Sequence, residues 1–157
     1  MSIDSEGNKV FGVWTLDLAS MSAKGTIYIW RIKMNVLGKK VADLNGNVTS
    51  LNFSPEKNTA TVEETDVGMF GTVIMTVTFW PPVDPDKKTG QYSEFGYTMR
   101  PDGTSLSFTM DGVWTEKDQG VWKVQGIALA EDGPKVFVDM EYEFATKSRK
   151  GELFELA

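Results

Sequence analysis

Apolar residues recur at every second position through most of this 157-residue chain. Between Lys135 and Phe144, for example, one face carries Val136, Val138 and Met140, while the intervening positions are largely charged. This period is that of a β-strand with one buried and one solvated face, whereas an amphipathic helix needs apolar residues three and four positions apart. No stretch of helical length in the sequence has the helical pattern. The chain is therefore predicted to be all-β.

Turn signals separate the predicted strands and indicate short, antiparallel connections. Asp102-Gly103 is typical of a two-residue hairpin turn, because both residues tolerate positive φ. Asn45-Gly46 gives a similar signal, and Glu131-Asp132-Gly133 indicates a three-residue loop. The predicted strands cover residues 10–18, 26–36, 39–44, 47–53, 59–64, 70–80, 91–100, 104–116, 120–129, 135–144 and 151–156, with Gly38 as a bend or bulge.

The turns also predict which residues pair, since a hairpin's register follows from its turn. A two-residue turn at Asp102-Gly103 places Tyr97 opposite Phe108, so both side chains are expected on the apolar inner face. The other expected pairs are Met99 with Leu106, Phe95 with Met110, Ala128 with Val136, Val124 with Met140, Trp122 with Tyr142, Tyr142 with Phe154 and Met140 with Leu156, while Trp114 is expected beside Trp122.

About eight to ten antiparallel strands with one apolar face are not expected to remain an open sheet. An open sheet would expose its apolar face and leave two unpaired edges, and no predicted helix covers that face. We therefore predict one all-β domain over residues 1–157, a calycin-like up-and-down β-barrel in which residues 1–9 form a flexible N-terminal segment. A β-sandwich is the alternative.

The chain contains no cysteine and no histidine, which excludes several classes of chemistry. Nucleophile systems built on Ser–His–Asp or Cys–His, the usual zinc sites and haem ligation all need these residues, and no metal or cofactor is expected. The 16 basic and 22 acidic residues give a net charge of −6, which argues against a nucleic-acid partner. The polar start lacks the pattern of a signal peptide, and no apolar run approaches the roughly 20 residues of a membrane span, so a cytoplasmic protein is expected.

The predicted inner face combines aromatic rings with methionines, and this combination suits a ligand cavity. Buried tyrosine and tryptophan need partners for their polar tips, and methionine adapts its shape to what it contacts. Small barrels are either filled by side chains or hold one small ligand. The residues expected to contact a ligand are Trp14, Trp30, Met34, Met75, Phe79, Phe95, Met99, Phe108, Met110, Trp114, Trp122, Met140 and Tyr142.

Phe11-Gly12-Val13-Trp14, on the first predicted strand, resembles the G-x-W signature of lipocalins and their calycin relatives. In that family the tryptophan closes one end of the barrel and a basic residue near the last strand packs across it, a role that the resemblance gives to Arg149 or Lys150. The segment 151–157 is loosely similar to the last strand of intracellular fatty-acid-binding proteins, although the helical pair of that family is not predicted here. The resemblance implies a calyx for a hydrophobic small molecule.

Three functions fit these observations. The first is a barrel that binds a hydrophobic small molecule. The second is a cyclase or isomerase that positions its substrate in the same cavity, for example for a cycloaddition or ring-forming step of natural-product biosynthesis. In an enzyme, the candidate catalytic residues are Tyr28, Tyr97 and Glu94. The third is a filled barrel that serves as an interaction module, and a homodimer is left open. A cavity of roughly 300 Å³ or more separates the first two from the third, and a buried carboxylate or arginine in it favours the enzyme.

Overall fold

The computed structural model describes residues 2–3, 9–10, 37–131 and 133–156. The chain divides into two units, residues 1–35 and residues 36–157. In the first, β1 (Ser2–Ile3) and β2 (Lys9–Val10) form an antiparallel pair. Most of the strands expected near 10–18 and 26–36, together with four candidate site residues, lie outside the described residues, so their place in the barrel stays a prediction. These four are Trp14, Tyr28, Trp30 and Met34.

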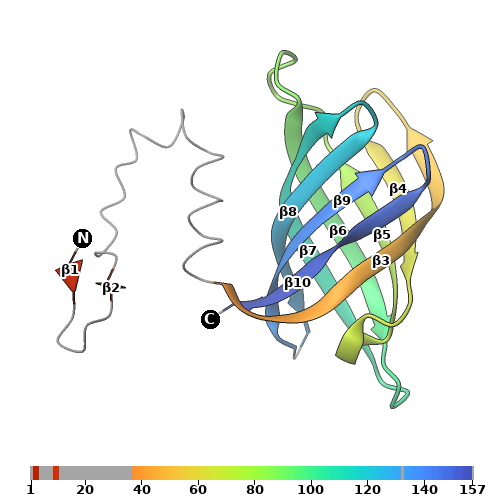
Figure 1. Ribbon diagram of the computed structural model, residues 1–157. Coiled ribbons are helices and arrows are strands. Elements are labelled where there is room, and N and C mark those ends of the chain that lie inside the picture. The colour runs from red at the N-terminus through yellow and green to blue at the C-terminus, as the bar shows by residue number, and fades with distance from the viewer. Residues whose placement is uncertain (1, 4–8, 11–36, 132, 157) are drawn as a thin grey trace. The chain divides into compact units, whose positions relative to one another are not determined.

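Eight strands of the second unit form a closed antiparallel barrel of up-and-down topology, as the alternating pattern predicts (Figure 1). Each strand pairs with its neighbours in sequence, and β10 pairs with β3 to close the sheet. In the described part of the chain, no helix has the length and apolar character that crossing a bilayer requires. The elements are β3 (Leu37–Phe53), β4 (Asn58–Glu64), the 3-10 turn η2 (Gly68–Phe70), β5 (Thr72–Phe79), β6 (Thr89–Met99), β7 (Ser105–Asp118), β8 (Val121–Ala130), β9 (Lys135–Glu143) and β10 (Ser148–Leu156).

β3 is one long strand, so the hairpin predicted at Asn45-Gly46 is wrong. Asn45 lies opposite Lys150, and Gly46 lies opposite Arg149 on one side and Glu64 on the other. Neighbouring strands therefore supply ladder partners on both sides of Gly46 and on one side of Asn45, and they outweigh the local preference of the dipeptide for a turn. Buried positions alternate through the dipeptide without a break.

The β6–β7 hairpin has a longer loop than predicted. The chain turns over residues 100–104, where the N–H of Arg100 donates to the carbonyl oxygen of Thr104. Asp102 stabilises this loop, because its Oδ1 accepts hydrogen bonds from the backbone N–H of Thr104 at 2.8 Å and from its hydroxyl at 2.6 Å. Gly103 adopts a φ of 84° there.

The longer loop changes the register of this hairpin by one residue, so that Gly96 rather than Tyr97 lies opposite Phe108. Because side chains alternate between the two faces, β6 presents the opposite face to the interior from the one predicted. Phe95, Tyr97 and Met99 lie on the outer wall with 51, 52 and 43% of their surface exposed, and their predicted place on the inner face is wrong.

The last two hairpins give one confirmed register and one correction. Ala128 with Val136, Val124 with Met140 and Trp122 with Tyr142 all pair as predicted, and the rings of Trp114 and Trp122 stack with centroids 4.3 Å apart. The β9–β10 turn comes earlier than predicted, because Lys147 takes a φ of 52° and its N–H donates to the carbonyl oxygen of Phe144. Tyr142 therefore pairs with Arg149 and Met140 with Gly151, in place of Phe154 and Leu156.

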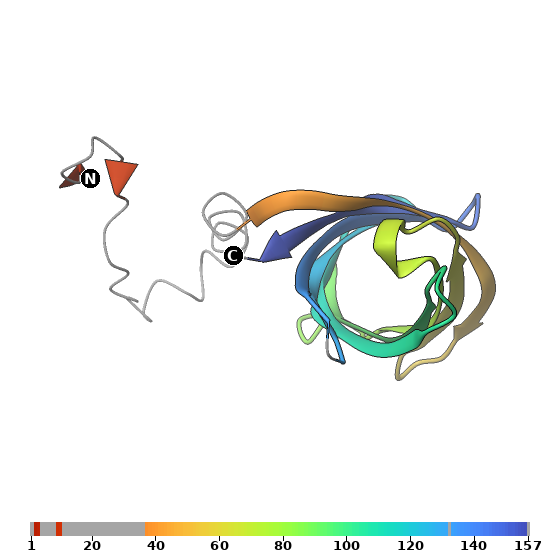
Figure 2. The same ribbon diagram turned by 90° about the horizontal axis from the view of Figure 1, so that it is seen from below.

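The two ends of the barrel interior differ. At the end with the β3–β4 and β5–β6 connections, Phe79 packs edge-on against the rings of Tyr92, Trp122, Tyr142 and Phe144. At the opposite end η2 lies across part of the opening, as the view along the barrel shows (Figure 2). The aromatic packing closes the first end, and a buried polar cluster lies between this packing and the η2 end.

Candidate functional site

Three neighbouring strands place two charged side chains on either side of a glycine. Gly46 of β3 lies opposite Glu64 of β4 and, across its other edge, opposite Arg149 of β10. A Cβ atom at Gly46 would lie 2.6 Å from Cγ of Glu64. The missing side chain thus leaves the space that the Glu64 side chain occupies, and it lets Glu64 and Arg149 meet across β3.

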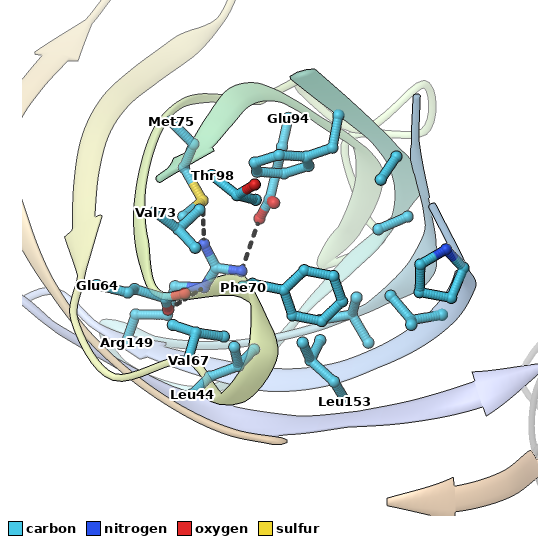
Figure 3. A pocket seen from close by; sticks show the side chains of 16 residues that line it. Leu44, Glu64, Val67, Phe70, Val73, Met75, Glu94, Thr98, Arg149 and Leu153 are labelled. Atoms are coloured by element: carbon cyan, nitrogen blue, oxygen red, sulfur yellow. Dashed lines mark hydrogen bonds and ion pairs between the residues drawn. The ribbon is translucent and has the colours of Figure 1, made fainter. Parts of the chain in front are cut away.

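Arg149 lies at the centre of a polar cluster that is closed to solvent (Figure 3). Its Nε lies 3.2 Å from Oε1 of Glu64, and its Nη2 lies 3.1 Å from Oε1 of Glu94. Nε also approaches Sδ of Met140 at 2.9 Å, and Nη1 donates to Sδ of Met75. Arg149, Glu64 and Glu94 are 2, 2 and 5% exposed, so their charges are stabilised by one another and by these contacts rather than by water.

Two tyrosines extend the cluster toward the aromatic end of the barrel. The hydroxyl of Tyr92 donates to Oε1 of Glu94 and lies 2.6 Å from the hydroxyl of Tyr142. Because the Tyr92 proton is directed at Glu94, Tyr142 acts as the donor between the two hydroxyls. Burial raises the pKa of both tyrosines, so both remain protonated at neutral pH.

The cluster holds one cation and two carboxylates, which gives a formal charge of −1 when all three are ionised. Burial raises the pKa of Glu64 and the neighbouring Glu94 adds to this, whereas Arg149 opposes it. Burial works to lower the pKa of Arg149, but Glu64 and Glu94 raise it well above its usual range, so the guanidinium stays charged. Glu64 is therefore a buried carboxyl group that takes up a proton more readily than a solvated one.

Glu64→Gln is expected to change how the stability of the barrel depends on pH. The pKa of Glu64 is higher in the folded state than in the unfolded state, where it has the ordinary carboxyl pKa. The wild-type protein therefore loses stability as the pH rises from the ordinary pKa through the raised pKa. The variant is neutral at this position throughout. Its melting temperature relative to wild type, followed by circular dichroism, should therefore increase as pH is raised from about 4 to about 8.

Glu63→Gln is the matched control for this experiment, because Glu63 is the exposed neighbour on the same strand. It removes the same formal charge without touching the cluster. A difference between Glu64→Gln and wild type that does not vary with pH, or one that Glu63→Gln reproduces, would contradict the raised pKa of Glu64.

An apolar cavity of about 50 Å³ adjoins the cluster at the η2 end of the barrel (Figure 3). Since one water needs a cavity volume of roughly 10–15 Å³, the cavity has room for about four waters. The volume of roughly 300 Å³ that separates a ligand-binding barrel from a filled one is not reached in the part of the chain that the structure describes. Its apolar lining comes from Leu44, Val67, Phe70, Val73, Met75, Phe108, Ala128, Ala130, Pro134, Val136, Val138 and Leu153, and its polar lining from Glu64, Glu94, Thr98 and Arg149.

The structure distributes the predicted site residues over several places. Met75, Phe108 and Glu94 line the cavity. Phe79, Trp114 and Trp122 border a second hollow of about 130 Å³ at the aromatic end, beside Trp80 and Pro81. Met110, Met140 and Tyr142 are buried in the core, while Phe95, Tyr97 and Met99 lie on the outer wall.

Sequence reasoning missed four residues of this site: Glu64, Tyr92, Thr98 and, as part of a charged cluster, Arg149. A signal was present for Glu64, which occupies the same face of β4 as the buried Ala60 and Val62. A charged residue in phase with the apolar positions of a strand indicates a buried partner elsewhere in the fold.

Comparison of the chain with known protein families, curated proteins and solved structures gives no match in any of the three. The eight-stranded closed barrel is consistent with the calycin-like fold expected from the sequence.

Proposed function

We propose that this barrel binds a small hydrophobic molecule in the cavity beside η2. The observation that carries the proposal is that an apolar wall meets a few buried polar groups there, those of Glu64, Thr98 and Arg149. Apolar walls supply affinity through burial, and a few convergent polar groups orient the ligand. The aromatic packing at the other end of the barrel directs entry to the η2 end.

At about 50 Å³ the cavity is smaller than the roughly 300 Å³ of a ligand-binding barrel. As it stands it admits a short molecule or one end of a longer one, and binding of anything larger requires the cavity to widen. A longer ligand has to displace Phe70, which η2 holds over the cavity. Gly68 and Gly71, on either side of that side chain, have φ values of 49° and 70°. A short glycine-flanked turn moves at lower cost than a strand of the closed barrel, so η2 is the element that would admit a longer chain.

A series of 1-alkanols of increasing length tests the proposal by isothermal titration calorimetry. Each methylene that enters the cavity is worth about 0.8 kcal/mol, which is roughly a fourfold gain in affinity. The affinity is expected to rise with chain length and to level off where the cavity is full. Amide NMR shifts of Ala128 and Val136, which line the cavity, locate the bound alkanol.

Ala128→Phe should abolish binding, because its ring fills the cavity. Leu129→Phe is the matched control on the outer face of the same strand, and Tyr97→Phe is a second control on the outer wall. Both controls are expected to bind alkanols as the wild type does. Absence of saturable binding to the folded wild-type protein would overturn the proposal and would favour the filled barrel that serves as an interaction module.

A second candidate function is a cofactor-free cyclase or isomerase, and the Glu64 carboxyl at the cavity floor favours it. A carboxyl group with a raised pKa can donate a proton to a bound substrate, and Arg149 beside it can stabilise negative charge that develops there. Glu94 remains in the cluster, whereas Tyr97 faces away from the cavity. Native mass spectrometry of the protein from its natural source would identify a bound molecule, and loss of its turnover in Glu64→Gln with binding retained would support catalysis.

A further inference from the structure

We infer that the cavity selects an uncharged, hydroxyl-bearing ligand and rejects carboxylates, an inference that rests on the proposed binding function. A buried arginine beside an apolar cavity invites the opposite interpretation, that of an anion receptor. The charges around Arg149 decide between the two.

The positive charge of Arg149 is already compensated by neighbouring carboxyl groups and is not free to bind an anionic ligand. Among the described residues that line the cavity, the ionisable ones are Arg149, Glu64 and Glu94. Their sum is −1 when all are ionised, zero when one carboxyl group is protonated, and positive only when both carboxyl groups are protonated. A third carboxylate would therefore enter a region of low dielectric with no free countercharge.

Each side-chain nitrogen of Arg149 also already faces another group. Nε faces Glu64 and the sulfur of Met140, Nη2 faces Glu94, and Nη1 donates to the sulfur of Met75. A carboxylate is recognised best by two parallel N–H groups of one guanidinium. Each of the three nitrogens already faces one of these groups, so a carboxylate would compete with Glu64, Glu94 or a methionine sulfur for such a pair.

Two polar atoms at the cavity instead match a hydroxyl group. Oγ1 of Thr98 is buried without a hydrogen-bond partner in the described part of the chain, and the residue is only 4% exposed. Oε1 of Glu64 lies within ion-pair distance of Arg149 but likewise has no hydrogen bond there. A ligand hydroxyl both donates and accepts, so it can satisfy either of these atoms, and it pairs with Glu64 in either protonation state of that carboxyl group.

Isothermal titration calorimetry at about pH 7 compares three probes of equal chain length: 1-hexanol, hexanoate and hexylammonium. At this pH hexanoate and hexylammonium are charged and hexanol is neutral. Hexanol is expected to bind at least about tenfold tighter than either ion. Equal or tighter binding of hexanoate would overturn the inference by showing that Arg149 is free to receive anions. Tighter binding of hexylammonium would overturn it by showing that the cluster acts as a negative site. If none of the three binds, it is the proposed function that fails.

Removing the negative charges of the cluster should increase the affinity for hexanoate, a gain that a merely structural cluster would not produce. Glu64→Gln combined with Glu94→Gln leaves Arg149 as the lone charge of the cluster, and the affinity for hexanoate relative to that for hexanol is expected to rise at least about tenfold over wild type. The single variant Glu64→Gln, with an intermediate gain expected, serves if the double variant does not fold. Glu63→Gln is the control for net charge and should leave hexanoate binding as weak as in wild type. No gain for hexanoate in a folded variant would overturn the inference.

Discussion

Arg149→Met is expected to destabilise the barrel by about 3–5 kcal/mol, because it leaves two buried carboxylates without their cation. Glu64 and Glu94 approach Arg149 to 3.2 and 3.1 Å from opposite sides, and all three residues are almost fully buried. Urea denaturation, with the midpoint and slope compared between variant and wild type, measures the loss. The loss should be smaller in acid, where protonation removes the uncompensated charges.

A triple variant separates charge from packing in this result. Arg149→Met combined with Glu64→Gln and Glu94→Gln removes the cation and both anions, and replacing a whole buried ion pair by neutral groups is often nearly neutral for stability. We expect the triple variant to recover most of the stability that the single variant loses. A triple variant as unstable as Arg149→Met would show instead that the guanidinium acts mainly by filling space.

Trp114→Ala is expected to cost about 3–5 kcal/mol, the range typical of a buried aromatic side chain, although Trp114 also borders the hollow of about 130 Å³ at this end. The ring is 5% exposed, stacks on Trp122 with an interplanar angle of 13°, and donates from Nε1 to the carbonyl oxygen of Trp80 at 2.8 Å. Thermal and urea unfolding would measure the loss.

Trp80→Ala is the matched control, because the Trp80 residue is 39% exposed and Lys57 lies over the face of its ring. Its loss is expected to stay below about 1 kcal/mol. Similar losses for the two tryptophans would contradict the view that the aromatic end of the barrel is a packed closure rather than an open pocket.

The strands and their closure into a barrel were predictable from the sequence because the period-two pattern is local. The sequence of each strand indicates which of its positions face the core, as the alternation of buried and less buried positions through β5 shows. The register was predictable only where the turn residues determine the loop length by themselves. In the β6–β7 loop the side chain of Asp102 bonds to Thr104 and lengthens the turn, and that contact is not visible in the dipeptide Asp102-Gly103.

The charged cluster could not be predicted from local patterns, because each of its charges is unfavourable in the interior without the others. On β6 the outer positions Phe95, Tyr97 and Met99 are more apolar than the inner positions Glu94 and Thr98, so hydrophobicity alone selects the wrong face. On β10 the predicted turn covered Arg149 and removed it from the strand. The inner face of β6 and the place of Arg149 in a strand both depend on contacts between β4, β6 and β10. These strands come together only in the closed barrel.

The cation of this cluster lies on one of the two strands that meet when the barrel closes. β10 pairs with β3, and Arg149 comes with it, whereas Glu64 and Glu94 belong to strands made earlier in synthesis. Until β10 is in place, both carboxylates lack their counterion and favour a hydrated, open sheet. The strand pairing that completes the hydrogen-bonded ring is therefore also the one that brings the counterion of Glu64 and Glu94 into the interior.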